Sequence, residues 1–170
     1  MTAVLLTFFL LIIQTTLLKT FGWMTPDMAL IAAVYCGRKY GRLRGYRFGI
    51  VMGVMQDLFS FGLLGVNLFS KGLIGLVSGL IRESNVFDPR SMTTWMVFLL
   101  AFTVLNELIG TMYSSGPFGS AAAFAPTAYT IAKQSILNVT AGYLLFYIMD
   151  RIVNRLKRSQ TARYADLPGG

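Results

Sequence analysis

The chain has 170 residues, of which 55% are hydrophobic and 13% charged, with a net charge of +8 and a mean hydropathy of +0.60. A soluble domain of this size cannot bury so much apolar surface in one core, whereas a lipid bilayer accommodates it. Histidine is absent and Cys36 is the single cysteine, so the usual residues for zinc, disulfide and general-base chemistry are missing. No cofactor is predicted. The basic residues stand in short blocks between apolar segments, which does not indicate a nucleic-acid-binding surface.

Six apolar segments follow one another along the chain. The second segment opens with Pro26 and Asp27, two residues that suit the start of a helix. Several segments are shorter than the roughly 20 residues of an average span, which favours close packing or local bilayer thinning. The pattern predicts an all-α membrane protein, with a bundle of six short transmembrane helices in residues 1–150 and a basic cytoplasmic tail in 151–170. The six predicted helices are Ala3–Leu18, Asp27–Tyr40, Gly45–Phe61, Asn67–Ile81, Thr93–Tyr113 and Ala128–Met149.

The basic residues predict which side of the membrane each connection faces. Cytoplasmic connections collect lysine and arginine. Six spans with both termini in the cytoplasm place all three basic blocks inside and leave Lys19 as one stray outer charge. If the weakly apolar second segment does not cross, five spans with an outer N-terminus fit as well. The tail either sets the topology or also contacts anionic lipid. The blocks comprise Arg38, Lys39, Arg42, Arg44 and Arg47, then Arg82 and Arg90, then Arg151, Arg155, Lys157, Arg158 and Arg163.

Five ionisable residues fall within the predicted spans or at the start of one, and the topology places all of them in the outer half of the membrane. An isolated charge there costs roughly 2.5–3.5 kcal/mol on insertion scales, so these residues are expected to pair. We expect Asp57 to pair with Lys71, and Glu107 to pair with Lys133. The five are Asp27, Asp57, Lys71, Glu107 and Lys133.

Glycine recurs at every fourth position of two neighbouring segments, in line with one charge on each. Rows of small residues at this spacing let two helix backbones approach closely. The two rows predict an antiparallel hairpin with Asp57 and Lys71 at the outer end of a glycine-lined seam. The simpler alternative is that glycine is merely common in membrane helices. The rows are Gly45, Gly49, Gly53 and Asp57, and Lys71, Gly75 and Gly79.

The charges within the spans do not form a recognisable catalytic motif. The sequence contains no Ser-x-x-Lys or Gly-x-Ser-x-Gly pattern, and nothing near Glu107, Asn106 and Thr103 activates a nucleophile. We therefore predict structural or partner-binding roles for these charges. Ligand binding in an outward-open polar pocket, as in the substrate-binding subunit of a small-molecule transporter, is the alternative.

Several short motifs between residues 14 and 82 resemble the MreD family of bacterial rod-shape-determining membrane proteins. They are Gln-Thr-Thr-Leu-Leu at 14–18, Pro26-Asp27, Gly-Val-Met-Gln-Asp-Leu-Phe-Ser at 53–60, and Leu-Gly-Val-Asn at 64–67, which includes Gly65. The second half of the chain matches in hydropathy alone. Two positions depart from the family pattern, because Leu63 stands where a proline often precedes Leu-Gly, and Met24-Thr25 where a basic residue is common.

The resemblance implies a role in cell elongation at the bacterial inner membrane. It implies a non-enzymatic protein that acts beside an MreC-type single-pass protein, the MreB cytoskeleton, and RodA with its partner transpeptidase in lateral-wall peptidoglycan synthesis. It also implies a six-helix fold similar to the substrate-binding S components of energy-coupling-factor transporters.

Overall fold

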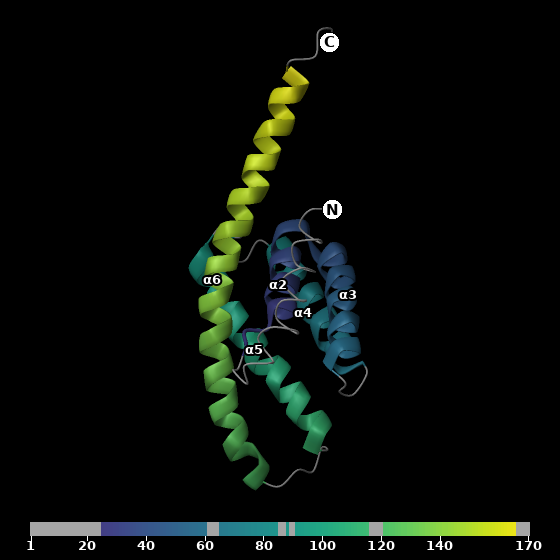
Figure 1. The fold of residues 1–170 in the computed structure, drawn as a ribbon, viewed down its shortest axis with the longest axis vertical. Coiled ribbons are helices and arrows are strands. Elements are labelled where there is room, and N and C mark those ends of the chain that lie inside the picture. Colours follow the sequence, from purple (N-terminus) through teal and green to yellow (C-terminus); the bar gives the residue numbers. More distant parts are fainter. Residues whose placement is uncertain (1–24, 61–64, 85–87, 89–90, 116–120, 166–170) are drawn as a thin grey trace.

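The computed structural model describes residues 25–60, 65–84, 88, 91–115 and 121–165. These residues form five helices and, in the described ranges, no strand. The first predicted segment, Ala3–Leu18, lies outside the described residues. The helices are α2 (Met28–Tyr40), α3 (Arg42–Ser60), α4 (Val66–Glu83), α5 (Met92–Ser115) and α6 (Ala121–Ala165) (Figure 1).

Helix α2 begins where the sequence indicates. Asp27 is its N-cap residue, and the Asp27 carboxylate accepts a hydrogen bond of 3.0 Å from the backbone N–H of Leu30. This bond satisfies one of the free N–H groups of the first turn. Pro26 precedes the cap, so it lies outside the first turn in which the sequence placed it. At the other end, Gly41 alone separates α2 from α3, and its φ of 90° is a conformation that glycine adopts without strain.

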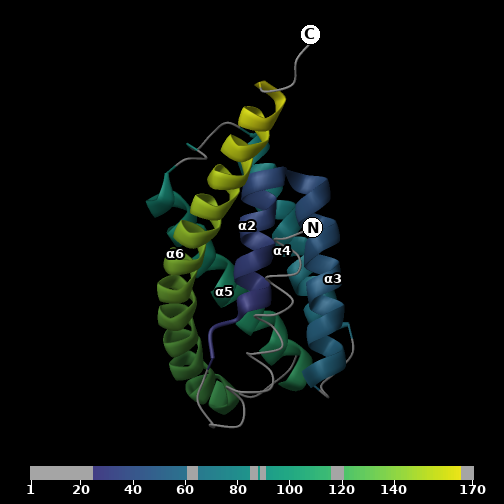
Figure 2. The ribbon, with the colours of Figure 1, turned by 45° about the horizontal axis from the view of Figure 1, so that its top comes forward.

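Helices α2, α3 and α4 pack side by side as one layer (Figure 2). The glycines of α3 lie against the backbone of α4 in antiparallel register. A Cβ atom on Gly45 would meet the Gly75 carbonyl, one on Gly49 the Lys71 carbonyl, and one on Gly53 the Asn67 carbonyl, all closer than 3.0 Å. The predicted glycine-lined hairpin is therefore confirmed.

The glycine seam also includes α2, which the sequence did not indicate. A Cβ on Gly37 would lie 2.6 Å from the Gly75 carbonyl and 2.9 Å from the Gly79 nitrogen. Three backbones therefore meet with almost no side-chain volume between them. Such close approach gains dispersion contacts that lipid cannot supply, and it explains how short helices form a stable unit in a bilayer.

The apolar core lies between this layer and the α5–α6 pair. Tyr35 of α2, Trp95 and Leu99 of α5, and Phe146 of α6 are all buried there. The rings of Tyr35 and Phe146 are 5.3 Å apart in a tilted arrangement, which aromatic pairs prefer over face-to-face stacking. On the outside, large apolar side chains such as Val97 and Leu144 are exposed, as expected of helices that face lipid.

Two helical stretches in the described part of the chain are long and apolar enough to cross a membrane: Met92–Met112 of α5 and Ala128–Val153 of α6. Helix α2 has only 13 residues, and α3 and α4 carry more charged residues for their length than these two stretches. By length and composition alone, none of these three helices is a candidate span. Helix α6 has 45 residues and runs well beyond the predicted Ala128–Met149, so the sequence underestimated its length. It continues without a break through residue 150, the predicted end of the bundle.

Candidate functional site

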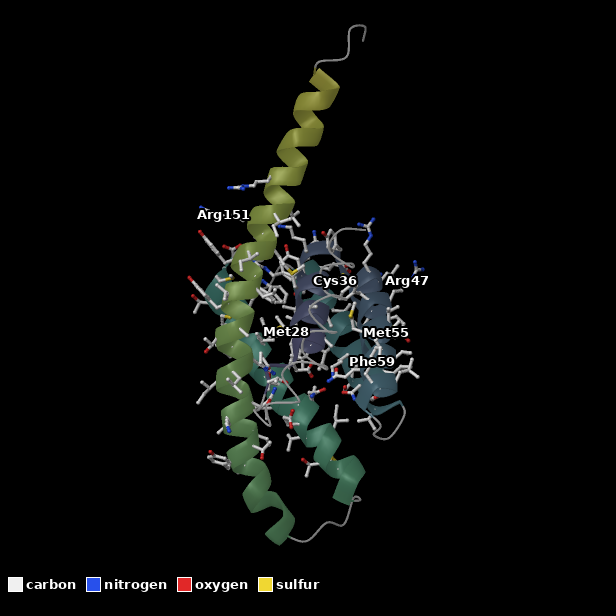
Figure 3. The ribbon with its side chains drawn as sticks, viewed as in Figure 1. Met28, Cys36, Arg47, Met55, Phe59 and Arg151 are labelled. Atoms are coloured by element: carbon white, nitrogen blue, oxygen red, sulfur yellow. The ribbon has the colours of Figure 1, made fainter. Side chains whose placement is uncertain are left out.

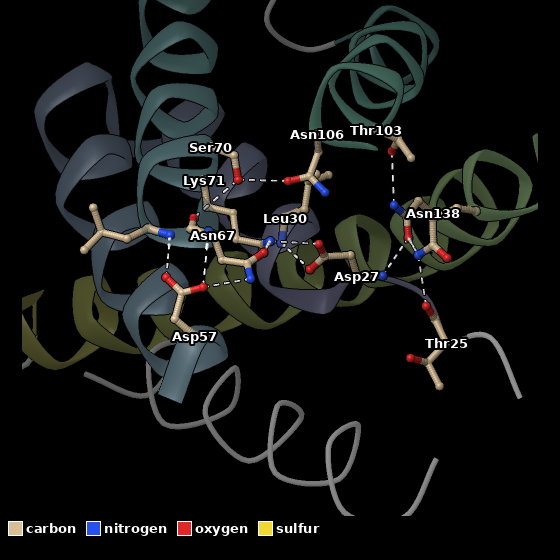
Figure 4. Close-up of polar contacts among 12 residues, drawn as sticks. Thr25, Asp27, Leu30, Asp57, Asn67, Ser70, Lys71, Thr103, Asn106 and Asn138 are labelled. Atoms are coloured by element: carbon tan, nitrogen blue, oxygen red, sulfur yellow. Dashed lines mark hydrogen bonds and ion pairs between the residues drawn. The ribbon is translucent and has the colours of Figure 1, made fainter. Parts of the chain in front are cut away.

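A chain of polar side chains crosses the interior of the bundle and links all five described helices (Figure 4). Its centre is an ion pair of 3.0 Å between Lys71 Nζ on α4 and Asp27 Oδ2 at the start of α2. Lys71 is completely buried, and the Asp27 side chain is 9% exposed. Lys71 also donates a hydrogen bond of 2.6 Å to Asn67 Oδ1. Two charges removed from water require this degree of pairing, because a lone buried charge is strongly unfavourable.

Asp57, at the end of α3, holds the start of α4. One of its carboxylate oxygens accepts hydrogen bonds from the backbone N–H and the side-chain amide of Asn67, at 3.2 and 2.9 Å. The other accepts from the N–H groups of Gly65 and Leu68, at 2.9 and 3.1 Å. Gly65, the N-cap residue of α4, has a φ of 102°, so a residue with a side chain would be strained there. The negative charge beside a helix N-terminus is also favourable.

The predicted ion pair between Asp57 and Lys71 is therefore wrong, although both residues lie in the same cluster. Asp27 takes the place of Asp57 opposite Lys71, and Asn67 bridges Lys71 and Asp57. The physical reason is that the Asp57 carboxylate already accepts hydrogen bonds from the N–H groups at the start of α4, which have no partner within the helix. The predicted pair of Glu107 and Lys133 is also wrong. Glu107 is half-buried on α5, whereas Lys133 is exposed on α6, and no ion pair joins them in the described structure.

The network continues from Asp27 into the α5–α6 pair. The backbone N–H of Asp27 donates to Asn138 Oδ1 on α6 at 2.6 Å, and Asn138 Nδ2 donates to Thr103 Oγ1 on α5 at 3.1 Å. Gln134 Nε2 donates to Asn138 Oδ1 and to the Thr25 carbonyl. These bonds attach the start of α2 to two helices that come much later in the chain.

A separate contact joins α4 to α5. Ser70 Oγ donates to Asn106 Oδ1 at 2.9 Å, and Ser70 is 1% exposed. Sequence reasoning missed Ser70, Gln134 and Asn138 as network members. The available signal was a polar residue in the middle of an apolar segment, where a hydrogen-bond partner is needed.

A second polar cluster surrounds Asp150 near the other end of the bundle, and no partner for this residue was predicted. Asp150 accepts a hydrogen bond of 3.0 Å from Tyr35 Oη and pairs with Lys39 at 2.8 Å and with Arg38 at 3.4 Å. The Arg38 guanidinium, 9% exposed, also lies 5.4 Å from the centre of the Phe146 ring. The cluster fixes the end of α2 to α6. In the sequence, Asp150 stands out as a single acidic residue next to the basic tail, which indicates that it needs a basic partner.

The polar side chains of both clusters bind one another across helix interfaces and so hold the helices together. The most buried acids, Asp27 and Asp57, are turned toward a lysine, amides and backbone N–H groups. Among the described residues, no three histidine, cysteine, aspartate or glutamate side chains converge as metal ligands would. A buried network whose members satisfy one another makes a fold rigid and specific.

Replacement of Asp57 by alanine should free the start of α4. The change removes the acceptor of three backbone N–H groups, so we expect a loss of about 2 kcal/mol in the free energy of unfolding. The amides of Gly65, Asn67 and Leu68 should exchange hydrogen faster, which mass spectrometry or NMR can measure in detergent micelles. Alanine at the exposed Lys133 is the control and should leave these amides unchanged. Unchanged exchange in Asp57→Ala would refute the capping role.

The fold and the network define an all-helical protein with two candidate membrane spans, whose buried polar residues join its described helices. Comparison with known families gives the more specific identification: the model of the rod shape-determining protein MreD matches residues 1–155, and the chain belongs to that family. Members of this family are non-catalytic membrane proteins of cell morphogenesis. Searches of curated proteins and of solved structures found no match.

Proposed function

We propose that this protein is a non-enzymatic component of the membrane complex that elongates rod-shaped bacteria and supports peptidoglycan synthesis. The observation that carries the proposal is the match of residues 1–155 to the MreD family. The described chain consists almost entirely of helices, so partners have to bind in the membrane plane or at its surfaces. We infer that an MreC-type single-pass protein is the direct partner, and that the MreB cytoskeleton and RodA with its transpeptidase are direct or indirect ones.

The proposed topology has six transmembrane helices in residues 1–150, with both termini in the cytoplasm and a basic tail in 151–170. Arg47 of α3 and Arg151 of α6 lie toward the same end of the bundle (Figure 3), and basic residues favour the cytoplasmic side. The network around Lys71 then lies in the outer half of the membrane. Because α2 packs within the bundle against α3 and α4, we infer that it crosses. A sixth crossing by Ala3–Leu18 would complete a bundle similar to the S components of energy-coupling-factor transporters.

The alternative function, a small-molecule-binding subunit of a transporter, gains no support from the network. A polar pocket requires side chains that remain available to a ligand. Asp27 is instead engaged by Lys71 and by the first turn of α2, and Asp57 by the start of α4. Neighbouring backbone occupies the space where a side chain would lie at four of the candidate residues: Gly49, Gly53, Gly75 and Gly79. Their proposed role is to hold the shape that a partner recognises.

Depletion of the protein from its rod-shaped host should make the cells round, and re-expression of the wild-type chain should restore rods. Phase-contrast microscopy of cell width and length measures this effect. Purification of the tagged protein in mild detergent should recover the MreC-type partner. Cells that keep their rod shape, together with a purified protein that never carries this partner, would contradict the proposal.

A further inference from the structure

Helix α6 extends far beyond the other described helices. Its 45 residues correspond to about 67 Å at a rise of 1.5 Å per residue, about twice the roughly 30 Å of the hydrocarbon core. The apolar stretch able to cross the membrane ends at Val153, whereas the helix continues to Ala165. In Figures 1 and 2 this last part projects from the bundle, with no other described helix beside it. We refer to residues 151–165 as the α6 extension.

The direction of the α6 extension is fixed at its base. Asp150, the residue directly before it, is held by Tyr35, Arg38 and Lys39 of α2. The extension also continues an established helix, so it avoids the unfavourable nucleation step that makes isolated short helices marginal in water. It therefore leaves the bundle as a preformed helix.

The α6 extension is strongly basic, with Arg151, Arg155, Lys157, Arg158 and Arg163 and no acidic residue in its 15 positions. At 100° per residue, the positions of Arg151, Arg155 and Arg158 fall within about 60° of one another around the helix, and we refer to these three positions as the arginine stripe. The same spacing places Lys157 and Arg163 at other positions around the helix, so basic residues are not confined to one face. Arg155 is exposed, and Ile152 is 39% exposed. A helix with basic residues and no acidic ones is electrostatically complementary to an acidic surface.

We propose that the α6 extension is a docking helix for a cytoplasmic protein that presents an acidic surface. The inference rests on the proposed function for the cytoplasmic location of the tail. Charge complementarity carries it, because arginine pairs with carboxylates through two hydrogen bonds in a fixed geometry.

The geometry favours a protein over the lipid surface as the occupant. Helices that bind lipid headgroups lie in the plane of the interface, whereas the extension continues the axis of a helix able to span the membrane. Ala165 lies about 18 Å beyond Val153 along that axis, more than the roughly 5–7 Å depth of one headgroup layer. Arg151 stacks 5.4 Å from the ring centre of Tyr147, one turn back toward the membrane. Arg155, one turn further out, is exposed.

Photocrosslinking in growing cells tests the proposal. A benzophenone amino acid replaces Ala162, which lies on the stripe side one turn beyond Arg158. We expect crosslinks to a cytoplasmic protein at an acidic segment, identified by mass spectrometry of the crosslinked peptide. The double variant Arg155→Gln/Arg158→Gln should reduce the adduct roughly three- to ten-fold. The matched control Arg155→Lys/Arg158→Lys keeps the charge and should retain most of the adduct. Arg151, Lys157 and Arg163 preserve the basic character that sets the topology.

Three results would overturn the proposal: adducts to lipid alone, no adduct, or an adduct that is unaffected by Arg155→Gln/Arg158→Gln. Cell shape separates this inference from the proposed function. If the wild-type chain restores rods but the crosslink fails in one of these ways, the docking helix is refuted and the proposed function stands. If the wild-type chain does not restore rods, the proposed function itself fails.

Discussion

Replacement of Lys71 by methionine should be among the most destabilising single changes in this protein. Methionine keeps the length of the side chain but removes its charge, so Asp27 remains buried opposite an apolar group. Breaking a buried ion pair in this way costs about 3–5 kcal/mol. Asp27→Asn should also destabilise, although asparagine can still cap α2. Titration of the purified protein from mild detergent micelles with SDS measures the free energy of unfolding.

The double variant Asp27→Asn/Lys71→Met identifies the partner of Lys71. The loss in the double variant should be smaller than the sum of the two single losses by about 2 kcal/mol, because neither charge is left alone. The matched cycle of Asp57→Asn with Lys71→Met should give a smaller coupling, since Asn67 lies between these residues. Strictly additive losses for Asp27 and Lys71 would show that the ion pair does not contribute to stability.

Replacement of Gly49 by alanine should separate α3 from α4. The new methyl group would overlap the backbone carbonyl of Lys71, and a carbonyl within a helix cannot move aside as a flexible side chain can. Overpacking of a tight contact costs about 1–3 kcal/mol, and we expect the upper end of this range. Thermal unfolding in detergent, followed by size-exclusion chromatography, measures the loss.

Gly110→Ala is the matched control for the glycine seam. Gly110 is also a helical glycine, but a Cβ there meets no atom within 4 Å. Alanine should therefore be neutral or stabilise α5 by about 0.5–1 kcal/mol, because it has the higher helix propensity. Equal losses in Gly49→Ala and Gly110→Ala would mean that helix packing at the seam is not what selects glycine.

Much of the helical framework could be predicted from the sequence, because local features mark it. Apolar runs between polar breaks predicted α2 to α5 to within a few residues, and Asp27 was correctly placed at a helix start. The fourfold spacing of glycine at Gly45, Gly49 and Gly53 predicted the α3–α4 contact. Spacing suffices here, because residues four apart share a helix face and a row of missing side chains can be filled only by another backbone.

The candidate site could be predicted only in part. Asp27, Asp57 and Lys71 were recognised as residues that need partners, because charges inside a membrane are costly. The partners themselves were wrong, since hairpin neighbours were expected to pair. Glu107 and Lys133 also lie on helices that pack together, yet one faces inward and the other is exposed.

Composition, periodicity and charge by themselves determined the class of protein, the positions of α2 to α5, and three charged residues that are buried with partners, Asp27, Asp57 and Lys71. Only the tertiary structure decided that Asp27 faces Lys71, that Asn138 joins α2 to α5 and α6, and that Asp150 fixes the base of a projecting helix. The reason is physical. Helical spacing fixes which side chains share a face, but the partner across an interface depends on the rotation and depth of each helix, which the packing of all the helices sets together.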